Sequence, residues 1–156
     1  MIKPVLLTVS YLLVAAVGFI VGVYALPIIV EPPAPSMVDL QMRADGARFT
    51  GAFRRDLPGS DFLHWGEGTL AVGSTTVSMR GELAPGPDYK LYLSPEPVAT
   101  AAEFQAVKAR AVALADVRSF HGFVISVPPA VAVEQYASVV IWCETFEKFI
   151  TAAQYR

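Results

Sequence analysis

The feature that most constrains this chain is a long uncharged span near its N-terminus. The run from Val5 to Val30 contains no Asp, Glu, Lys or Arg and consists mainly of apolar side chains. About 20 such residues in helical form are enough to span a bilayer. The rest of the chain is long enough for one ordinary domain. The span therefore predicts an N-terminal membrane segment followed by a single folded domain.

Two kinds of membrane segment fit such a span. A signal peptide has an apolar core of roughly 7 to 15 residues and ends at a small-residue cleavage site. Val23-Tyr24-Ala25 has the spacing of such a site, so cleavage stays open as the alternative. The apolar run continues through residues 26–30, however, and this extra length favours an uncleaved transmembrane anchor over residues 5–30.

The charges on either side of the span predict its orientation. Lys3 and the free amine lie before it, whereas Glu31 follows it with no Lys or Arg close by. The positive-inside rule then places residues 1–4 in the cytoplasm and the domain outside, in the periplasm or at the cell exterior. Residues 31–47 begin with Glu31-Pro32-Pro33-Ala34-Pro35-Ser36, and we expect them to form a proline-rich linker that lifts the domain off the membrane.

Residues 48–156 carry the pattern of short strands separated by turn residues. The expected strands cover residues 49–53, 68–72, 75–83, 89–93, 120–127 and 136–143. Short strands at this spacing predict an all-β domain, either a small antiparallel β-sandwich or a barrel. One short helix is expected within residues 100–114, with Thr100 as its N-cap and Glu103 placed as a capping box requires.

The only cysteine lies in the last of these expected strands. Val139 to Trp142 are all β-branched or aromatic and lead into Cys143 without a charge, which is typical of a strand buried on both faces. Strand alternation then directs Cys143 inward. Beyond it, apolar residues recur at helical spacing, which predicts a short helix or turn in residues 145–155.

Motifs in this half of the chain resemble those of the DM-thirteen domain family. The closing motif is Ile141-Trp142-Cys143-Glu144-x-Phe146 followed by Phe149 and Ala152-Ala153; the central one is Pro85-Gly86-Pro87-Asp88-x-Lys90-Leu91-Tyr92-Leu93-Ser94; and the opening is Gly51-x-Phe53 with His64 and Gly68. The resemblance implies a small extracytoplasmic module that works in electron transfer, with the cysteine at its centre. It covers nearly all of residues 48–156.

One part of the chain departs from the family pattern. Many members carry a Gln and a Tyr shortly before a Val-Pro or Ile-Pro pair. Here Phe123 and Ile125 precede Val127-Pro128, so no role of that tyrosine carries over to this chain.

Several common kinds of site are absent from the sequence. It has no Gly-rich phosphate loop and no Cys-x-x-Cys pair, which excludes dithiol exchange and thioether-linked haem. The net charge of −2 and the lack of a basic stripe argue against nucleic-acid binding. Ser60, Asp61 and His64 are close neighbours without a nucleophile-elbow motif, so no hydrolase is predicted. No recognisable catalytic constellation marks the chain as an enzyme.

Three side chains remain as candidates for redox or ligand chemistry. They are Cys143, as a redox thiol or ligand, and His64 and His121, as further ligands. Cysteine and histidine both bind haem or a soft metal when they share a pocket, although no particular metal is indicated. The alternatives are that Cys143 is an inert core residue and that each histidine is a solvated or hydrogen-bonded ring.

Two functions therefore stay open. In the first, a membrane-anchored extracytoplasmic module relays electrons through Cys143, or through a cofactor near it, to a membrane or periplasmic redox partner. In the second, the domain is a non-catalytic module of the cell envelope that binds a ligand or protein, or serves a structural role. In both, the bilayer is a partner through residues 5–30.

Overall fold

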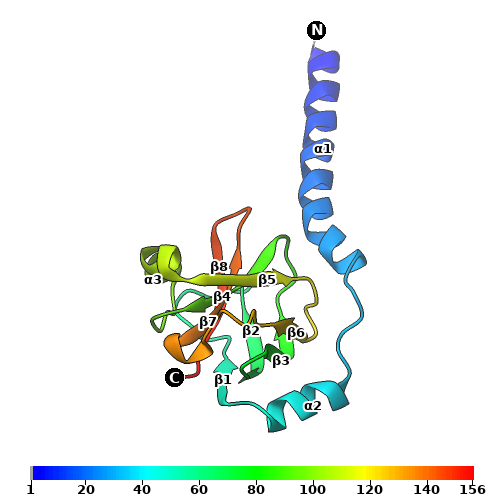
Figure 1. The fold of residues 1–156 in the computed structure, drawn as a ribbon. Coiled ribbons are helices and arrows are strands. Elements are labelled where there is room, and N and C mark those ends of the chain that lie inside the picture. Colours follow the sequence, from blue (N-terminus) through cyan, green and yellow to red (C-terminus); the bar gives the residue numbers. More distant parts are fainter. Residues whose placement is uncertain (1) are drawn as a thin grey trace.

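The computed structural model describes residues 2–156. It consists of a β-sandwich and a long apolar helix that projects from it (Figure 1). Helix α1 covers Ile2–Ile29. It is long and apolar enough to cross a membrane, and none of its most apolar stretch is buried by the rest of the chain. The expected long N-terminal helix is thus confirmed.

The folded part of the chain contains two four-stranded antiparallel sheets. The first has the order β1 (Phe49–Phe53), β2 (Gly66–Val72), β3 (Thr76–Leu83), β6 (Phe123–Ser126), and the second has the order β5 (Val112–Val117), β4 (Tyr89–Ser94), β7 (Ser138–Cys143), β8 (Lys148–Gln154). Of the two predicted all-β architectures, the sandwich is therefore the one that forms.

The main core lies between the two sheets. Inward-facing side chains from both sheets share it, among them Phe53, Leu70, Met79, Leu91 and Ile141. Because side chains alternate across a strand, each sheet can bury one set of apolar residues against the other sheet. This packing holds the two sheets face to face.

A second core lies on the outer face of the second sheet, beneath helix α3 (Ala101–Val107). Phe104 of this helix is fully buried. The predicted N-cap is present, since the Thr100 hydroxyl accepts a hydrogen bond from the Glu103 N–H at 3.3 Å. The Glu103 carboxylate in turn accepts the Ala99 N–H at 2.7 Å.

Two stretches predicted as helix contain strands instead. The helix expected over residues 100–114 ends at Val107 and gives way, after one 3-10 turn, to β5, which pairs with β4. Residues 145–155, expected as a helix or turn, form a turn and then β8. Short apolar runs have no distinctive periodicity, and β8 is buried on both faces, so pairing with β7 decides its conformation.

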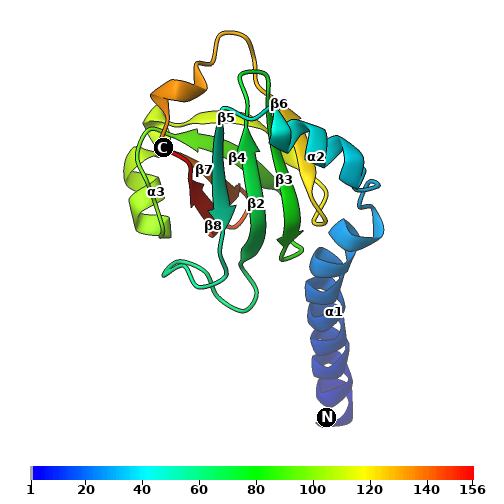
Figure 2. The ribbon, with the colours of Figure 1, turned by 90° about the horizontal axis from the view of Figure 1, so that it is seen from below.

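The prediction of one short helix besides the N-terminal helix was also wrong, because residues 2–156 contain a further α-helix. Helix α2 (Met37–Asp45) lies within the stretch expected to be a linker, and Figure 2 shows it beside β3. The Ser36 hydroxyl caps it by accepting the Asp39 N–H at 3.2 Å. Leu40 is buried and fixes α2 on the sandwich.

The chain is held to the domain directly after α1. The Glu31 carboxylate accepts hydrogen bonds from the Phe120 N–H at 2.7 Å and the Ser119 hydroxyl at 3.2 Å. It also lies 3.1 Å from Nδ1 of His121. Prolines of residues 32–35 then line a groove on the domain with residues of β5 and β6. This segment therefore runs along the surface of the sandwich.

Candidate functional site

Cys143 ends strand β7, and all six residues of this strand are buried. The cysteine is 2% exposed and belongs to the core between the sheets, together with Val139 and Ile141. Its Sγ donates a hydrogen bond to the Pro87 carbonyl oxygen, 3.1 Å away. The predicted inward direction of Cys143 is confirmed.

The surroundings of Cys143 keep its thiol neutral. Burial raises the pKa of the thiol, and the carboxylates of Asp88 and Glu144 raise it further. The backbone N–H groups of Phe146 and Thr145 act in the opposite direction but do not outweigh burial. Because the thiolate is the nucleophilic form of cysteine, this sulfur is poorly suited to attack on a disulfide or an electrophile.

Tyr89 faces Cys143 across the pair of strands β4 and β7. The tyrosine is buried, and its ring meets that of Phe120 edge-on with centroids 6.0 Å apart. Burial, followed by the nearby Cys143, raises the pKa of Tyr89 above its usual range. Tyr89 was not among the predicted site residues, since only strand pairing places it opposite the cysteine.

Trp142 points to the opposite face of the same sheet. Its ring lies 5.2 Å from that of Phe104, which in turn lies 5.2 Å from that of Tyr92. The Nζ of Lys108 is 5.1 Å from the Trp142 ring, a cation–π contact. Among the described residues, the buried Nε1 of Trp142 has no hydrogen-bond partner.

A polar group covers this aromatic cluster. Glu144 lies 2.8 Å from Nζ of Lys108 and accepts a hydrogen bond from the Tyr92 hydroxyl. Burial raises the pKa of the Glu144 carboxyl, but the hydrogen bonds from Lys108 and Tyr92 and the charge of Lys108 outweigh it and hold the pKa below its ordinary value. Sequence reasoning missed this trio because its members are far apart in the chain.

His64 lies in the loop between β1 and β2. Its Nδ1 is 2.8 Å from the Asp61 carboxylate, which also accepts the N–H groups of Leu63 and His64. The His64 side chain is only 19% exposed. Ser60 is not aligned with this pair, since its hydroxyl donates to the Ile150 carbonyl oxygen at 3.1 Å. No Ser-His-Asp relay is formed by these three residues.

His121 has a different partner, the Glu31 carboxylate, and its side chain is 64% exposed. The three predicted site residues are therefore engaged separately, Cys143 with Pro87, His64 with Asp61 and His121 with Glu31. Within residues 2–156, no group of three or more His, Cys, Asp or Glu side chains is arranged to hold a metal ion. The three candidate ligands are therefore not members of one metal-binding cluster among the described residues.

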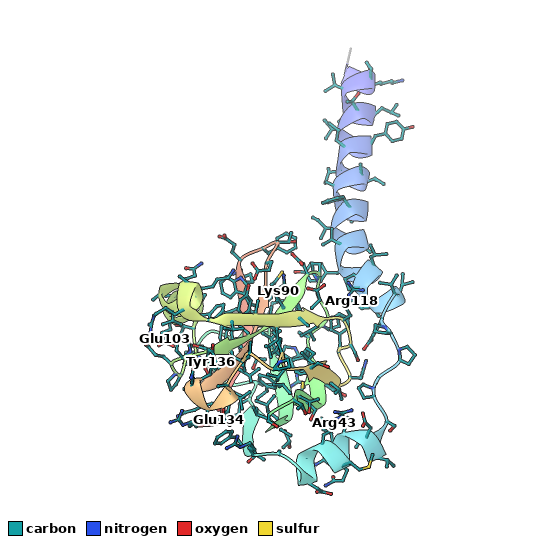
Figure 3. The ribbon with its side chains drawn as sticks, in the orientation of Figure 1. Arg43, Lys90, Glu103, Arg118, Glu134 and Tyr136 are labelled. Atoms are coloured by element: carbon teal, nitrogen blue, oxygen red, sulfur yellow. The ribbon has the colours of Figure 1, made fainter. Side chains whose placement is uncertain are left out.

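A pocket of about 420 Å³ lies between the end of α1 and the turn that contains Pro87. Leu26, Pro27 and Val30 form one wall, and the turn of residues 86–88 forms another. Pro87, whose carbonyl accepts the Cys143 hydrogen bond, therefore separates the sulfur from this pocket. Figure 3 shows Arg118, a further lining residue, beside the foot of α1.

The folded domain matches a known protein family over most of its length. A family model described as electron transfer DM13 matches residues 57–155, which include Cys143 and both histidines. No curated protein and no solved structure matches the chain. The resemblance that the sequence motifs indicate is thereby confirmed.

Proposed function

Because the chain belongs to the electron-transfer DM13 family, whose model covers more than half of its residues, we propose that it is a membrane-anchored electron-transfer module with its domain on the extracytoplasmic side. The anchor is α1, which has the length and composition of a membrane span. Lys3 before the span and Glu31 after it support a cytoplasmic N-terminus.

The observation that carries the redox part of this proposal is the position of Cys143. It is the only cysteine, it belongs to the matched region, and it lies behind the turn of residues 86–88 that faces α1. Oxidisable aromatic side chains adjoin it, Tyr89 across the strand pair and Trp142 next to it in the chain.

The burial of the neutral thiol disfavours covalent thiol chemistry at Cys143. Thiol–disulfide exchange requires a thiolate that contacts the other sulfur directly. Electron transfer requires no such contact between Cys143 and its redox partner. In the resting state, the Pro87 carbonyl oxygen accepts a hydrogen bond from the Cys143 S–H group. When the redox partner takes one electron from Cys143, the S–H proton must leave for solvent, because a carbonyl oxygen is too weak a base to hold it. In this function, the side chains of the chain itself carry the electron.

A second function is supported by the same burial. Cys143 packs as a small apolar residue in the core, and its raised pKa is that of an inert structural cysteine. In that case the domain is a non-catalytic binding or structural module of the cell envelope. The two functions differ in whether Cys143 changes its oxidation state.

Voltammetry of the full chain in detergent micelles separates these functions. We expect a redox signal from the wild type that is lost in Cys143→Ser, which keeps a hydrogen-bond donor near Pro87, and in Cys143→Ala. Ser60→Ala, which leaves the thiol untouched, is the matched control and keeps the signal. A thiol reagent should label native Cys143 slowly and the denatured chain rapidly, which verifies burial in the sample used.

The outcomes are distinct. A signal that persists in both cysteine variants removes Cys143 from the electron path. No signal in the wild type, from a folded protein whose cysteine is reduced, favours the binding or structural module.

A further inference from the structure

The exposed large apolar side chains of the sandwich are unevenly distributed. Within residues 49–156, they are Phe62, Leu63 and Phe146, which are 86%, 41% and 54% exposed. Phe62 and Leu63 belong to the loop between β1 and β2, and Phe146 belongs to the turn between β7 and β8. Single exposed apolar residues are common on protein surfaces. These three residues indicate a contact surface only if they lie close to one another and on the side of the sandwich that faces α1.

These two loops lie at the same end of the sandwich. The first loop is tied to the start of β8, since the Ser60 hydroxyl donates to the Ile150 carbonyl oxygen. The β7–β8 turn is tied to the turn before β4, where the Thr145 hydroxyl donates to the Asp88 carboxylate at 2.6 Å and the Glu144 N–H donates to the Asp88 carbonyl at 3.1 Å. We call this surface, made of residues 59–64, 85–88 and 144–147, the proximal end.

The proximal end is the end that adjoins α1. Residues 86–88 share a pocket with Leu26, Pro27 and Val30 at the C-terminal end of the helix. In Figure 1 the β7–β8 turn projects from the sandwich in the direction in which α1 runs toward its N-terminus. Helix α2, which carries exposed apolar residues of its own, packs instead on the outer face of the first sheet, against β2 and β3.

The connection between α1 and the sandwich fixes this arrangement. Glu31 is two residues beyond the end of α1, and its carboxylate is bonded to Ser119 and Phe120 and faces His121. A flexible tether would let the sandwich move away from the bilayer. Here the residue that leaves the helix is itself bound to the domain, so the proximal end stays close to the level at which α1 ends.

From this geometry we infer that the proximal end docks on the surface of the bilayer that α1 spans, with Phe62, Leu63 and Phe146 inserted at the interface. The inference rests on the proposed membrane anchoring. Aromatic and apolar side chains at the edge of a protein bury favourably at the boundary between headgroups and acyl chains. The pocket beside Pro87, and with it the wall in front of Cys143, then faces the lipid.

The charges of the proximal end show which lipid chemistry it fits. Its three segments contain Asp61, Asp88, Glu144 and Glu147 and no Lys or Arg. Attraction to anionic headgroups, which depends on basic residues, therefore does not drive this contact. Docking is by apolar insertion, so it needs no anionic lipid.

Tryptophan reporters in the full chain, reconstituted in phosphatidylcholine vesicles, test the inference. Phe62→Trp and Phe146→Trp keep an aromatic ring at the docking positions, and Ser74→Trp places the same reporter on the exposed β2–β3 turn at the other end of the sandwich. Lipids brominated near the headgroups should quench the tryptophan fluorescence of Phe62→Trp and Phe146→Trp more than that of Ser74→Trp. The native Trp65 and Trp142 contribute the same background fluorescence to all three variants, so the difference reports the added tryptophan. Adding Phe146→Ser to Phe62→Trp should reduce that quenching, whereas phosphatidylglycerol should not increase it.

Two results would overturn docking. One is quenching of Phe62→Trp and Phe146→Trp that is no greater than that of Ser74→Trp. The other is found in detergent solution without vesicles. If the tryptophans of Phe62→Trp and Phe146→Trp become more protected from solvent as the protein concentration rises, a second copy of the chain covers the proximal end. Flotation of the vesicles in carbonate distinguishes a failure of the membrane anchor from a failure of docking. A chain that does not float refutes the anchoring, whereas a chain that floats with unquenched reporters refutes only the docking.

Discussion

Trp142 and Cys143 are neighbours in the chain but occupy different environments. Cys143 lies between the sheets, and Trp142 lies on the outer face, between β7 and helix α3. Strand alternation alone produces this separation. As a result, the thiol adjoins Tyr89 and Pro87, whereas the indole adjoins Phe104 and the Lys108 ammonium. A change at one of the two residues should leave the environment of the other largely intact.

At this scale we expect Trp142→Ala to destabilise the domain far more than His64→Ala. Trp142 is among the largest fully buried side chains, and truncation of such a residue costs about 3 to 5 kcal/mol. His64 contributes mainly a hydrogen bond with the Asp61 carboxylate, worth about 0.5 to 1.5 kcal/mol. Chemical denaturation of both variants measures the difference. Equal losses would show that the His64–Asp61 loop has a structural role as large as that of the second core.

At the scale of elements, strands β2 and β3 approach each other unusually closely at one point. Gly68 and Gly81 are directly paired there. A Cβ atom on Gly81 would overlap the Glu67 carbonyl oxygen, and one on Gly68 would overlap the Arg80 carbonyl oxygen. Only glycine permits this approach, since both positions lack a side chain and have positive φ angles.

We therefore expect Gly81→Ala to destabilise the first sheet by about 1 to 3 kcal/mol, because the strands must separate or adopt a strained backbone. Gly73→Ala in the β2–β3 turn is the matched control, since its Cβ would meet the Thr76 carbonyl oxygen at an ordinary 3.5 Å. Urea unfolding curves of the two variants give the comparison. A Gly81→Ala variant as stable as Gly73→Ala would contradict the close approach of β2 and β3.

At the scale of the whole molecule, Glu31 joins the apolar helix to the sandwich. Burial raises the pKa of its carboxyl, but hydrogen bonds from the Phe120 N–H and from His121 and Ser119, with the charge of His121, hold the pKa below the ordinary value of 4.5. The folded chain thus binds this proton less readily than the unfolded chain. The resulting stability is present above pH 4.5 and is lost as the pH falls through the lower pKa of the folded state.

Glu31→Gln should reveal this linkage. At neutral pH we expect a loss of about 1 kcal/mol, because a charged acceptor forms stronger hydrogen bonds than a neutral one. Between pH 6 and pH 3, the unfolding temperature of Glu31→Gln should fall less than that of the wild type. Glu82→Gln, an exposed carboxylate on β3, is the control and should follow the wild type. The same acid dependence in Glu31→Gln and wild type would mean that the carboxylate does not clamp the helix to the domain.

The sequence by itself determined the features that depend on local pattern. These include the apolar span, the strand from Phe49 to Phe53, the cap at Thr100 and the inward direction of Cys143, because charge, alternation and capping act over a few neighbouring residues. Only the tertiary structure decided that β5 and β8 are strands, since their partners supply the hydrogen bonds that composition cannot indicate. It also decided that His64, His121 and Cys143 have separate partners, and that Phe62 and Phe146 lie at one end beside α1. These relations join residues far apart in the chain, and it is the pairing and packing of the strands that brings them together or keeps them apart.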